Sequence, residues 1–452
     1  MQKNKAVYAL PLLAKLLLLV CGAFLVWSSM GVSGSINASL GIYEIAKYAL
    51  LFTFVLICVG IILQNAQLIA SLCKAISIVM LLQAMAGIFQ YHGVAFTELP
   101  GANALPYGLM ANRNLFGSAL AFMLPFSVYA VYNSKGFWRI FSISSLAVCA
   151  YALVLSQTRS AWLGAVAVML VSLLLSVLFI KPFNKKWLLW YGIAAVSILA
   201  IGYIAVATDT QGGLAKEVTE RVNSLAGGNA ADSASGAAAN SNERIKIWKK
   251  TLQVIKDNPV TGVGFGNWKV VVPKYGTSGT VWETGKTVPD RVHNVYLQVI
   301  AETGWLGGIL FILIWLLVAG CGLVALKKSA SNAQKFLIAV LLGGLAAFGI
   351  DCMFSFGIER IEHTVLLGLM AAILIAQYLQ VTTKEKTETT TAKKMPWLLP
   401  VCYMGLAAFC IFLGKEKYHF EKQLPIANAY QKQGKIPKLL KRWKKEAAAG
   451  LP

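Results

Sequence analysis

Residues 304–326, GWLGGILFILIWLLVAGCGLVAL, form a stretch without Asp, Glu, Lys or Arg. A helix needs about 20 apolar residues to cross a bilayer, so this stretch is long enough to span one. The other ten apolar stretches of similar length lie near 8–28, 43–63, 69–89, 109–131, 139–157, 160–180, 188–207, 335–354, 362–380 and 397–414. They are too long, and too free of two-residue alternation, for barrel strands. The sequence therefore predicts an all-α, polytopic membrane protein with about 11–12 transmembrane helices.

The composition excludes other classes of protein. Of the 452 residues, 57% are hydrophobic and only 13% are charged, more apolar surface than a soluble domain could bury. The net charge of +22 does not indicate nucleic-acid binding, because much of it lies in short connections and tails beside the apolar stretches. The eight cysteines lie in apolar stretches without a CxxC pair, so neither a disulfide framework nor a zinc site is expected.

The distribution of lysine and arginine predicts the topology. With a cytoplasmic N-terminus, four of the five inside connections are basic, whereas the outside connections 29–42 and 90–108 contain no Lys or Arg. The basic N-terminus resembles a signal peptide, but its apolar stretch is long and lacks an A-x-A exit, so it is interpreted as a retained first span. We expect four regions: a bundle of seven spans (1–207), a large outside loop (208–303), C-terminal spans (304–414) and a basic helical tail (415–452).

The large loop divides by composition. Residues 224–242 are small and polar, which is typical of a segment without a fixed structure. From residue 242 apolar side chains recur near helical spacing, which predicts a helix on the membrane surface that ends at Asn258-Pro259 and a turn in TGVGFGNW. The glycines of that turn lack the Lys-Ser/Thr of a phosphate-binding P-loop. A second helix is expected to start near His293 and to meet the next span at 304–305.

Three residues of the outer face are candidates for chemistry. Arg159 lies in a turn between two spans, where it could bind lipid phosphates only, or could hold an anionic substrate. Arg244 begins the loop helix among several lysines, where a solvated charge is the usual interpretation. His293 is the loop's single histidine; such a residue is more often structural, but an imidazole can accept a proton from a hydroxyl near neutral pH.

Further polar residues near the membrane rim are possible supporting groups. The predicted site includes four of them as supporting residues: Asn112, Asn114, Arg291 and Arg360. Three more polar residues are expected at a similar depth in the membrane: Arg113, Asp351 and Glu359. One alternative is that Glu359 and Arg360 simply pair with each other. The sequence has neither an H-E-x-x-H motif nor a cluster of His, Cys, Asp and Glu, so a metal cofactor is not expected.

Four stretches, taken in order, resemble the O-antigen ligase and polymerase superfamily of bacterial envelope glycan assembly. They are GLMANRNLFGSALAFMLP (108–125), LSQTRSAWLG (155–164), NERIKIWKKTLQVIKDNPVTGVGFGNW (242–268) and HNVYLQVIAETGWLGG (293–308). The resemblance implies a metal-independent, inverting glycosyltransferase of the GT-C type in the bacterial inner membrane. It would take a glycan from undecaprenyl diphosphate at the periplasmic face and pass it to an acceptor hydroxyl. By position, Arg159 and Arg244 correspond to the family's diphosphate-binding arginines and His293 to its loop histidine. The family usually has about twelve spans with both ends inside, whereas eleven place the tail outside.

The resemblance leaves the acceptor open. O-antigen ligation to lipid A-core is the first expectation, and polysaccharide polymerisation or O-glycosylation of protein Ser or Thr is the alternative. The partners expected are therefore the lipid-linked glycan donor, one of these acceptors and membrane lipids, but no nucleic acid. A lipid-linked glycan transporter is less favoured, because the candidate cations gather at one face and the large loop has no mirrored partner.

Overall fold

The computed structural model describes residues 10–98, 106–110, 112–182, 186–209, 236–276 and 290–383, with isolated positions at 213–216, 218–219, 278, 280, 283, 405 and 408. Within these residues the chain is helical and contains no strand. The long apolar helices are α1 (Leu12–Val32), α2 (Ala38–Gln64), α3 (Leu68–Tyr91), α4 (Arg113–Asn133), α5 (Gly136–Ser156), α6 (Arg159–Phe179), α7 (Lys186–Ala207), α11 (Val295–Lys328), α12 (Asn332–Phe354) and α13 (Ile361–Thr382). The all-α membrane fold predicted from the sequence is confirmed.

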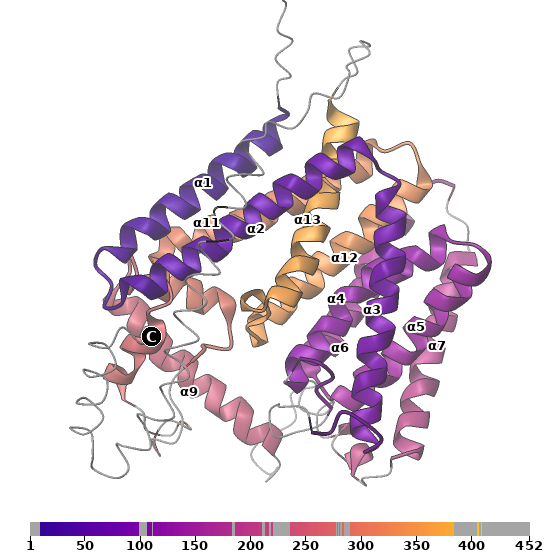
Figure 1. Ribbon diagram of the computed structural model, residues 1–452, viewed down its shortest axis with the longest axis horizontal. Helices are drawn as coiled ribbons and strands as arrows, with labels where there is room; N and C mark the ends of the chain where they lie inside the picture. The colour runs from indigo at the N-terminus through magenta and orange to yellow at the C-terminus, as the bar shows by residue number, and fades with distance from the viewer. Residues whose placement is uncertain are drawn as a thin grey trace, which may run out of the picture.

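Nine of the described helices, α1 to α6 and α11 to α13, are long and apolar enough to cross a membrane. Helix α7 occupies the seventh predicted span. The eleventh prediction, 397–414, and the basic tail, 415–452, lie outside the described residues apart from two isolated positions. Figure 1 shows α1 and α2 beside α11 on one flank, α3, α5 and α7 on the other, and α12 and α13 between them. Successive spans alternate in direction, so the turns before α2, α4, α6 and α13 share one end of the bundle with the large loop, here named the loop end.

Close packing of small residues joins α6 to α12. A Cβ at Gly343 of α12 would approach the carbonyl oxygen of Val168 to 2.9 Å, and one at Gly164 of α6 would lie 3.4 Å from the Cβ of Ala347. Such close backbone approach is a common way for helices to associate within a membrane. It holds the start of α6, which carries Arg159, beside the end of α12.

The large loop forms a small core of its own at the loop end. Its buried side chains come from four elements: helix α9 (Gly236–Asp257), the short α10 (Trp268–Val271), the 3₁₀ turn η1 (Val272–Tyr275) and the start of α11. Its fully buried members include Val254, Trp268 and Val272. Helix α9 begins at Gly236, six residues before the predicted start at 242; the added turns contain alanines, which have the highest helix propensity. The rest of the predicted unstructured stretch, 224–235, lies outside the described residues.

The predicted turn in TGVGFGNW is confirmed, and it connects the loop to the bundle. Gly262, Gly264 and Gly266 all have positive φ, which glycine adopts at little cost. The turn packs against the ends of the first two spans: Asn267 Nδ2 donates to the Asn37 carbonyl at 3.0 Å, and the Asn37 amide donates to Asn267 Oδ1 at 2.8 Å. The loop is thereby anchored to α1 and α2.

Within helix α11, a helix of the loop joins a membrane-spanning helix, as the sequence predicted. Gly304 has φ 72° and ψ 179° and interrupts the helical backbone there. The chain from Pro259 to Val263 runs along this kink: the Trp305 amide donates to the Pro259 carbonyl, and the Val263 amide to the Ala301 carbonyl, both at 3.0 Å. The kink separates the His293 end of α11 from the membrane-spanning part.

Replacement of Gly304 should therefore destabilise the loop end. Its backbone conformation is almost exclusive to glycine, and a Cβ would overlap the carbonyl of Val260. We expect Gly304→Ala to lower the folded yield and the thermal stability, by at least about 2–3 kcal/mol. Fluorescence-detected size-exclusion chromatography after heating measures this. Gly60→Ala in α2, where an added Cβ meets nothing within 4 Å, is the control and should behave as wild type; equal stability of the two variants would contradict this account.

Candidate active site at the loop end

Arg244 is placed by the packing of α9 against the loop before α11. Trp248, one helical turn after Arg244, donates its indole N–H to the Val292 carbonyl at 3.0 Å. Residues four apart lie on one face of a helix, so Arg244 lies on the face of α9 that meets the residues around His293. Arg244 is half-buried, whereas Lys246 and Lys249 on the other faces are exposed. Arg244 thus differs from the solvated lysines of its helix.

His293 lies in a tight, well-supported turn directly before α11. Its φ is 58°, in the left-handed region that few residues other than glycine adopt. Asn294 caps α11, because its Oδ1 accepts the amide of Leu297 at 3.0 Å. The imidazole packs edge-on against the Phe356 ring, with 5.3 Å between centroids and 67° between planes. His293 is therefore held by both backbone and ring contacts.

Arg159 is the first residue of α6 and follows a turn that is fastened to α4. Gln157 ends α5 in the left-handed conformation, and its Oε1 accepts Arg113 Nη1 at 2.9 Å. Thr158 Oγ1 donates to the Arg113 carbonyl at 3.1 Å. Asn112 caps α4 by accepting the amide of Asn114 at 2.8 Å. The structure thus gives Asn112 a helix-capping contact, and any contribution of Asn112 or Asn114 to binding stays a prediction.

The structure places the three predicted residues at the loop end, where their charges influence one another in sequence from Arg159 to Arg244 to His293. Burial lowers the pKa of Arg244, and the positive charge of Arg159 lowers it further, so the two guanidinium groups are within electrostatic range of each other. Asp351 of α12 and Glu243 partly offset this effect. Burial, followed by the charge of Arg244, lowers the pKa of His293 to about 4. Arg244 therefore acts on an imidazole that is neutral at pH 7, and Arg159, from a distant part of the sequence, acts in turn on Arg244.

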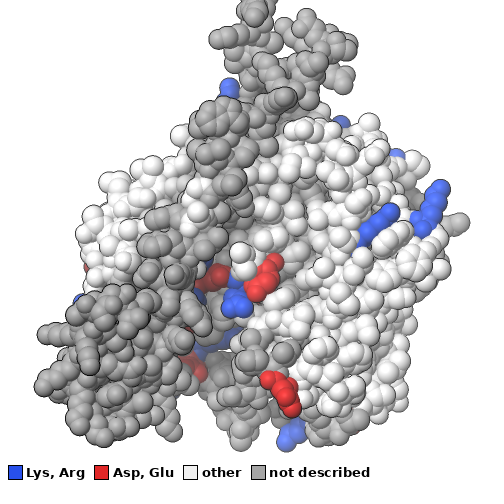
Figure 2. Space-filling view, in the orientation of Figure 1, with Lys and Arg blue, Asp and Glu red and all other residues white. Residues whose placement is uncertain are grey.

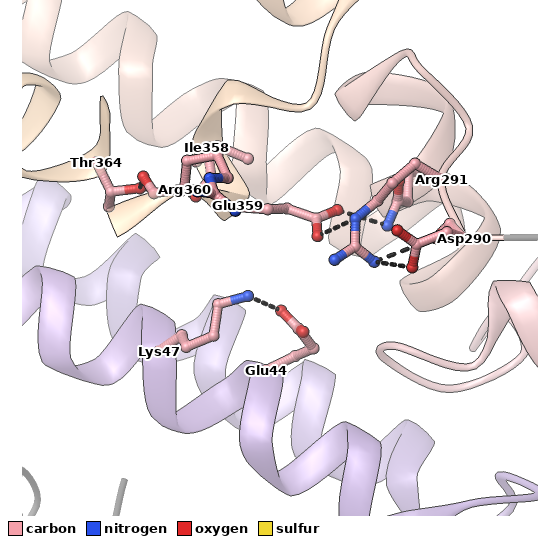
Figure 3. Close-up of polar contacts among 9 residues, drawn as sticks. Glu44, Lys47, Asp290, Arg291, Ile358, Glu359, Arg360 and Thr364 are labelled. Carbon is pink, nitrogen blue, oxygen red and sulfur yellow. Dashed lines mark hydrogen bonds and ion pairs between the residues drawn. The ribbon is translucent and has the colours of Figure 1, made fainter. Parts of the chain in front are cut away.

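The two further predicted arginines have carboxylate partners. Arg291 Nε forms an ion pair with Glu359 Oε2 at 2.5 Å, and Arg291 Nη1 lies 3.3 Å from Asp290 Oδ1 (Figure 3). Burial alone would lower the pKa of Arg291, but the charges of Glu359 and Asp290 raise it overall. Arg360 Nη2 lies 3.5 Å from Glu362 Oε1. The alternative that Glu359 pairs with Arg360 is therefore wrong, because η2 (Gly357–Glu359) turns the glutamate towards the loop.

Several residues of this region were not singled out by sequence motifs. Phe356 contacts His293, and Gln298 joins Glu359 to the loop. Glu44, Glu302 and Glu359 line a cavity of about 20 Å³ together with Gln298. The three glutamates could have been found from the sequence, because a charged residue within or beside an apolar helix is unusual. Nothing in the sequence distinguishes Phe356 or Gln298, whose contacts depend on the fold. Figure 2 shows acidic and basic side chains gathered at a hollow, while much of the surrounding described surface is uncharged.

Asp351 is a buried acid near the arginines. Its Oδ1 accepts a hydrogen bond from Ser118 Oγ of α4 at 2.6 Å. Its charge raises the pKa of Arg244 and so partly offsets the effect of burial on that residue. Among the described residues, no group of three or more His, Cys, Asp and Glu side chains has an arrangement that could hold a metal ion.

Part of the chain is similar to known proteins. Residues 144–312, which include Arg159, Arg244 and His293, match the family model described as O-Antigen ligase. The chain is 25% identical over 329 residues to a "General O-oligosaccharyltransferase" of Acinetobacter baylyi, covering 69% of this chain and 51% of the relative. It is 24% identical over 219 residues to the "Exopolysaccharide production protein ExoQ" of Rhizobium meliloti, covering 46% and 44%. The chain thus spans about half the length of the curated relatives it matches. As its motifs indicated, part of the chain is similar to the O-antigen ligase family, whose model matches residues 144–312.

Proposed function

We propose that this protein transfers a glycan from undecaprenyl diphosphate to an acceptor hydroxyl at the periplasmic face of the bacterial inner membrane. The family match and both relatives support a transferase of lipid-linked glycans. The observation that carries the proposal is the placement of two arginines at the loop end: Arg159 begins α6, and Arg244 lies on the face of α9 that meets the residues around His293. The charge of Arg159 acts on Arg244, and His293 is neutral at pH 7. A pair of half-buried like charges is unfavourable by itself, and a bound diphosphate would offset the repulsion.

The reaction needs a stabilised leaving group. Attack of the acceptor oxygen on the anomeric carbon breaks the bond between that carbon and the diphosphate oxygen, and negative charge grows on the departing undecaprenyl diphosphate. Guanidinium groups that are already positioned stabilise this charge without reorganisation. Attack opposite the leaving group inverts the anomeric centre. In this proposal the reaction is metal-independent, because the two arginines supply the positive charge.

The acceptor must lose a proton as the new bond forms. His293 is neutral at pH 7 because its pKa is lowered to about 4, so a nitrogen lone pair is available to accept that proton or to orient the hydroxyl. Burial is the main cause of the lowered pKa of His293, and the positive charge of Arg244 lowers it further; that charge would be countered once the diphosphate binds. Donor binding would thus make His293 a stronger base at the moment when it is needed.

For the acceptor, we propose lipid A-core and hence O-antigen ligation, in accord with the family description. A protein hydroxyl is the second candidate, favoured by the similarity to a protein named as an O-oligosaccharyltransferase over 69% of this chain. The two reactions share the donor site, so Arg159, Arg244 and His293 would have the same roles in both.

Purified full-length protein incubated with an undecaprenyl diphosphate-linked glycan tests the proposal. Lipid A-core, a growing glycan and a Ser/Thr-containing acceptor protein are offered in separate reactions, with mass spectrometry of each product. We expect the glycan on lipid A-core with inverted anomeric configuration. If the glycan is found only on the protein or only on the growing glycan, the acceptor is reassigned. If no acceptor leads to release of undecaprenyl diphosphate, the proposed function is contradicted.

A further inference from the structure

A half-buried ion pair lies next to the turn that carries His293 (Figure 3). Arg291, two residues before His293, reaches Glu359 at 2.5 Å, and their side chains are only 18% and 11% exposed. Breaking a buried pair by removing one partner leaves an uncompensated charge, so its geometry is strongly maintained. The pair joins the loop to η2, which connects α12 to α13.

The same glutamate holds the chain on the other side of His293. Gln298 Nε2, in the first turns of α11, donates to Glu359 Oε1 at 2.9 Å. The Oε1 of Gln298 accepts the amide of Val292 at 3.4 Å. One carboxylate of Glu359 therefore binds residues on both sides of His293, through a different oxygen in each case.

His293 needs this support because its own conformation is unfavourable. A non-glycine residue in the left-handed region is retained only where its surroundings over-determine it. Phe356, three residues before Glu359, packs against the imidazole edge-on at 5.3 Å. The segment 356–359 thus contacts the ring through Phe356 and the flanking backbone through Glu359.

The groups around Glu359 differ from the cations of the proposed donor site. Arg291 is neutralised by Glu359 and Asp290. Glu44 and Lys47 of α2 form their own pair at 2.6 Å on the other side of this region, as Figure 3 shows. Arg244, in contrast, is affected by the like charge of Arg159. The charges near Glu359 are thus suited to holding structure, and those near Arg244 to holding an anion.

We propose that Glu359 is a positioning residue: by binding Arg291 and Gln298 it fixes the turn of His293 so that the imidazole faces Arg244. This inference deepens the proposed function and rests on it for the catalytic consequence, whereas the effect on the turn is independent of substrate. Glu359 itself touches neither donor nor acceptor in this assignment. Its loss should lower kcat, while the donor KM, set by Arg159 and Arg244, changes little.

Chemical modification of His293 tests the positioning without substrate. Diethyl pyrocarbonate modifies neutral, accessible imidazole, and mass spectrometry of the His293 peptide gives the rate. In Glu359→Gln the carboxamide keeps the size of the side chain but loses the ion pair, and the turn should open more often. We expect modification at least about fivefold faster than in wild type. Glu362→Gln is the matched control: it removes a carboxylate three residues away, whose pair with Arg360 is half-exposed, and it should keep the wild-type rate.

A transfer assay on the same variants gives the catalytic consequence. Small misplacement of a catalytic group is costly, so kcat of Glu359→Gln should fall about tenfold to hundredfold with the donor KM within about threefold. Glu359→Asp keeps the charge but shortens the side chain by one methylene. It should give modification and transfer rates between those of wild type and Glu359→Gln. If Glu359→Gln does not fold, the comparison of Glu359→Asp with wild type tests the proposal. Equal His293 modification in the Glu359 variants and Glu362→Gln would overturn the positioning role. Absence of transfer by wild type would contradict the proposed function alone, since the modification rates still decide the role of Glu359.

Discussion

Arg244→Ala should abolish detectable glycan transfer while the protein still assembles in the membrane, and Arg159→Ala should do the same. Each substitution removes one of the two guanidinium groups that converge at the loop end. Loss of one preorganised charge-stabilising group typically lowers kcat by about 10²–10³. Folding should persist, because removing either cation relieves repulsion of the other in the protein without substrate. Because both arginines act on one leaving group, the double variant should be scarcely less active than either single variant.

Replacing each arginine by lysine keeps the positive charge but removes the planar guanidinium, so these variants separate the effect of charge from that of side-chain geometry. A guanidinium can donate to two phosphate oxygens at once, whereas an ammonium is a point charge. Arg244→Lys and Arg159→Lys should therefore recover only part of the lost activity. Lys249→Ala is the matched control, since Lys249 is an exposed cation of the same helix as Arg244. Purified transfer assays and complementation of a strain lacking the gene measure the effect; near-normal transfer by either arginine-to-alanine variant would rule out its role in diphosphate binding.

The positions of the spans could be predicted from the sequence because a bilayer imposes one length and one polarity on each crossing helix. Helical spacing of apolar residues predicted the loop helices, and Asn258-Pro259 with the following glycines predicted the turn that packs beside Gly304. The start of α9 was misplaced, because residues 236–242 show no apolar periodicity that would indicate a helix. Their alanines favour a helix, but helix propensity alone is a weaker signal than periodicity.

The candidate site was only partly predictable. Motif order singled out Arg159, Arg244 and His293, and topology placed them on one face, but only the fold brings Arg159 into range of Arg244. Arg291 and Glu359 are 68 residues apart and their pairing has no local signature. The adjacent Arg360 was the obvious partner by sequence, yet backbone direction in η2 sends neighbouring side chains to different sides. Pairing of charges across a fold depends on such directions, which sequence spacing does not contain.

His293→Ala should lower kcat by about 10²–10⁴, the range typical of a lost general acid or base. The donor KM should change little, because the arginines that hold the diphosphate remain. His92→Ala is the matched control: His92 follows α3, and its imidazole Nε2 lies 3.0 Å from Tyr151 Oη, in a separate contact. The initial transfer rates of the two purified variants are compared with that of wild type. Full activity of His293→Ala would exclude proton transfer by this residue.

The pH dependence distinguishes a base from a merely structural imidazole. Burial and the charge of Arg244 lower the pKa of His293 to about 4 in the free protein, so the neutral, proton-accepting form prevails above that pH. Since kcat/KM for the donor reports the free protein, its acidic limb should lie near pH 4. The bound diphosphate opposes the charge of Arg244 and so favours the protonated imidazole. The acidic limb of kcat, which reports the complex, should therefore lie at higher pH than that of kcat/KM. Both limbs should be absent from the residual activity of His293→Ala; their persistence in that variant would assign them to another group.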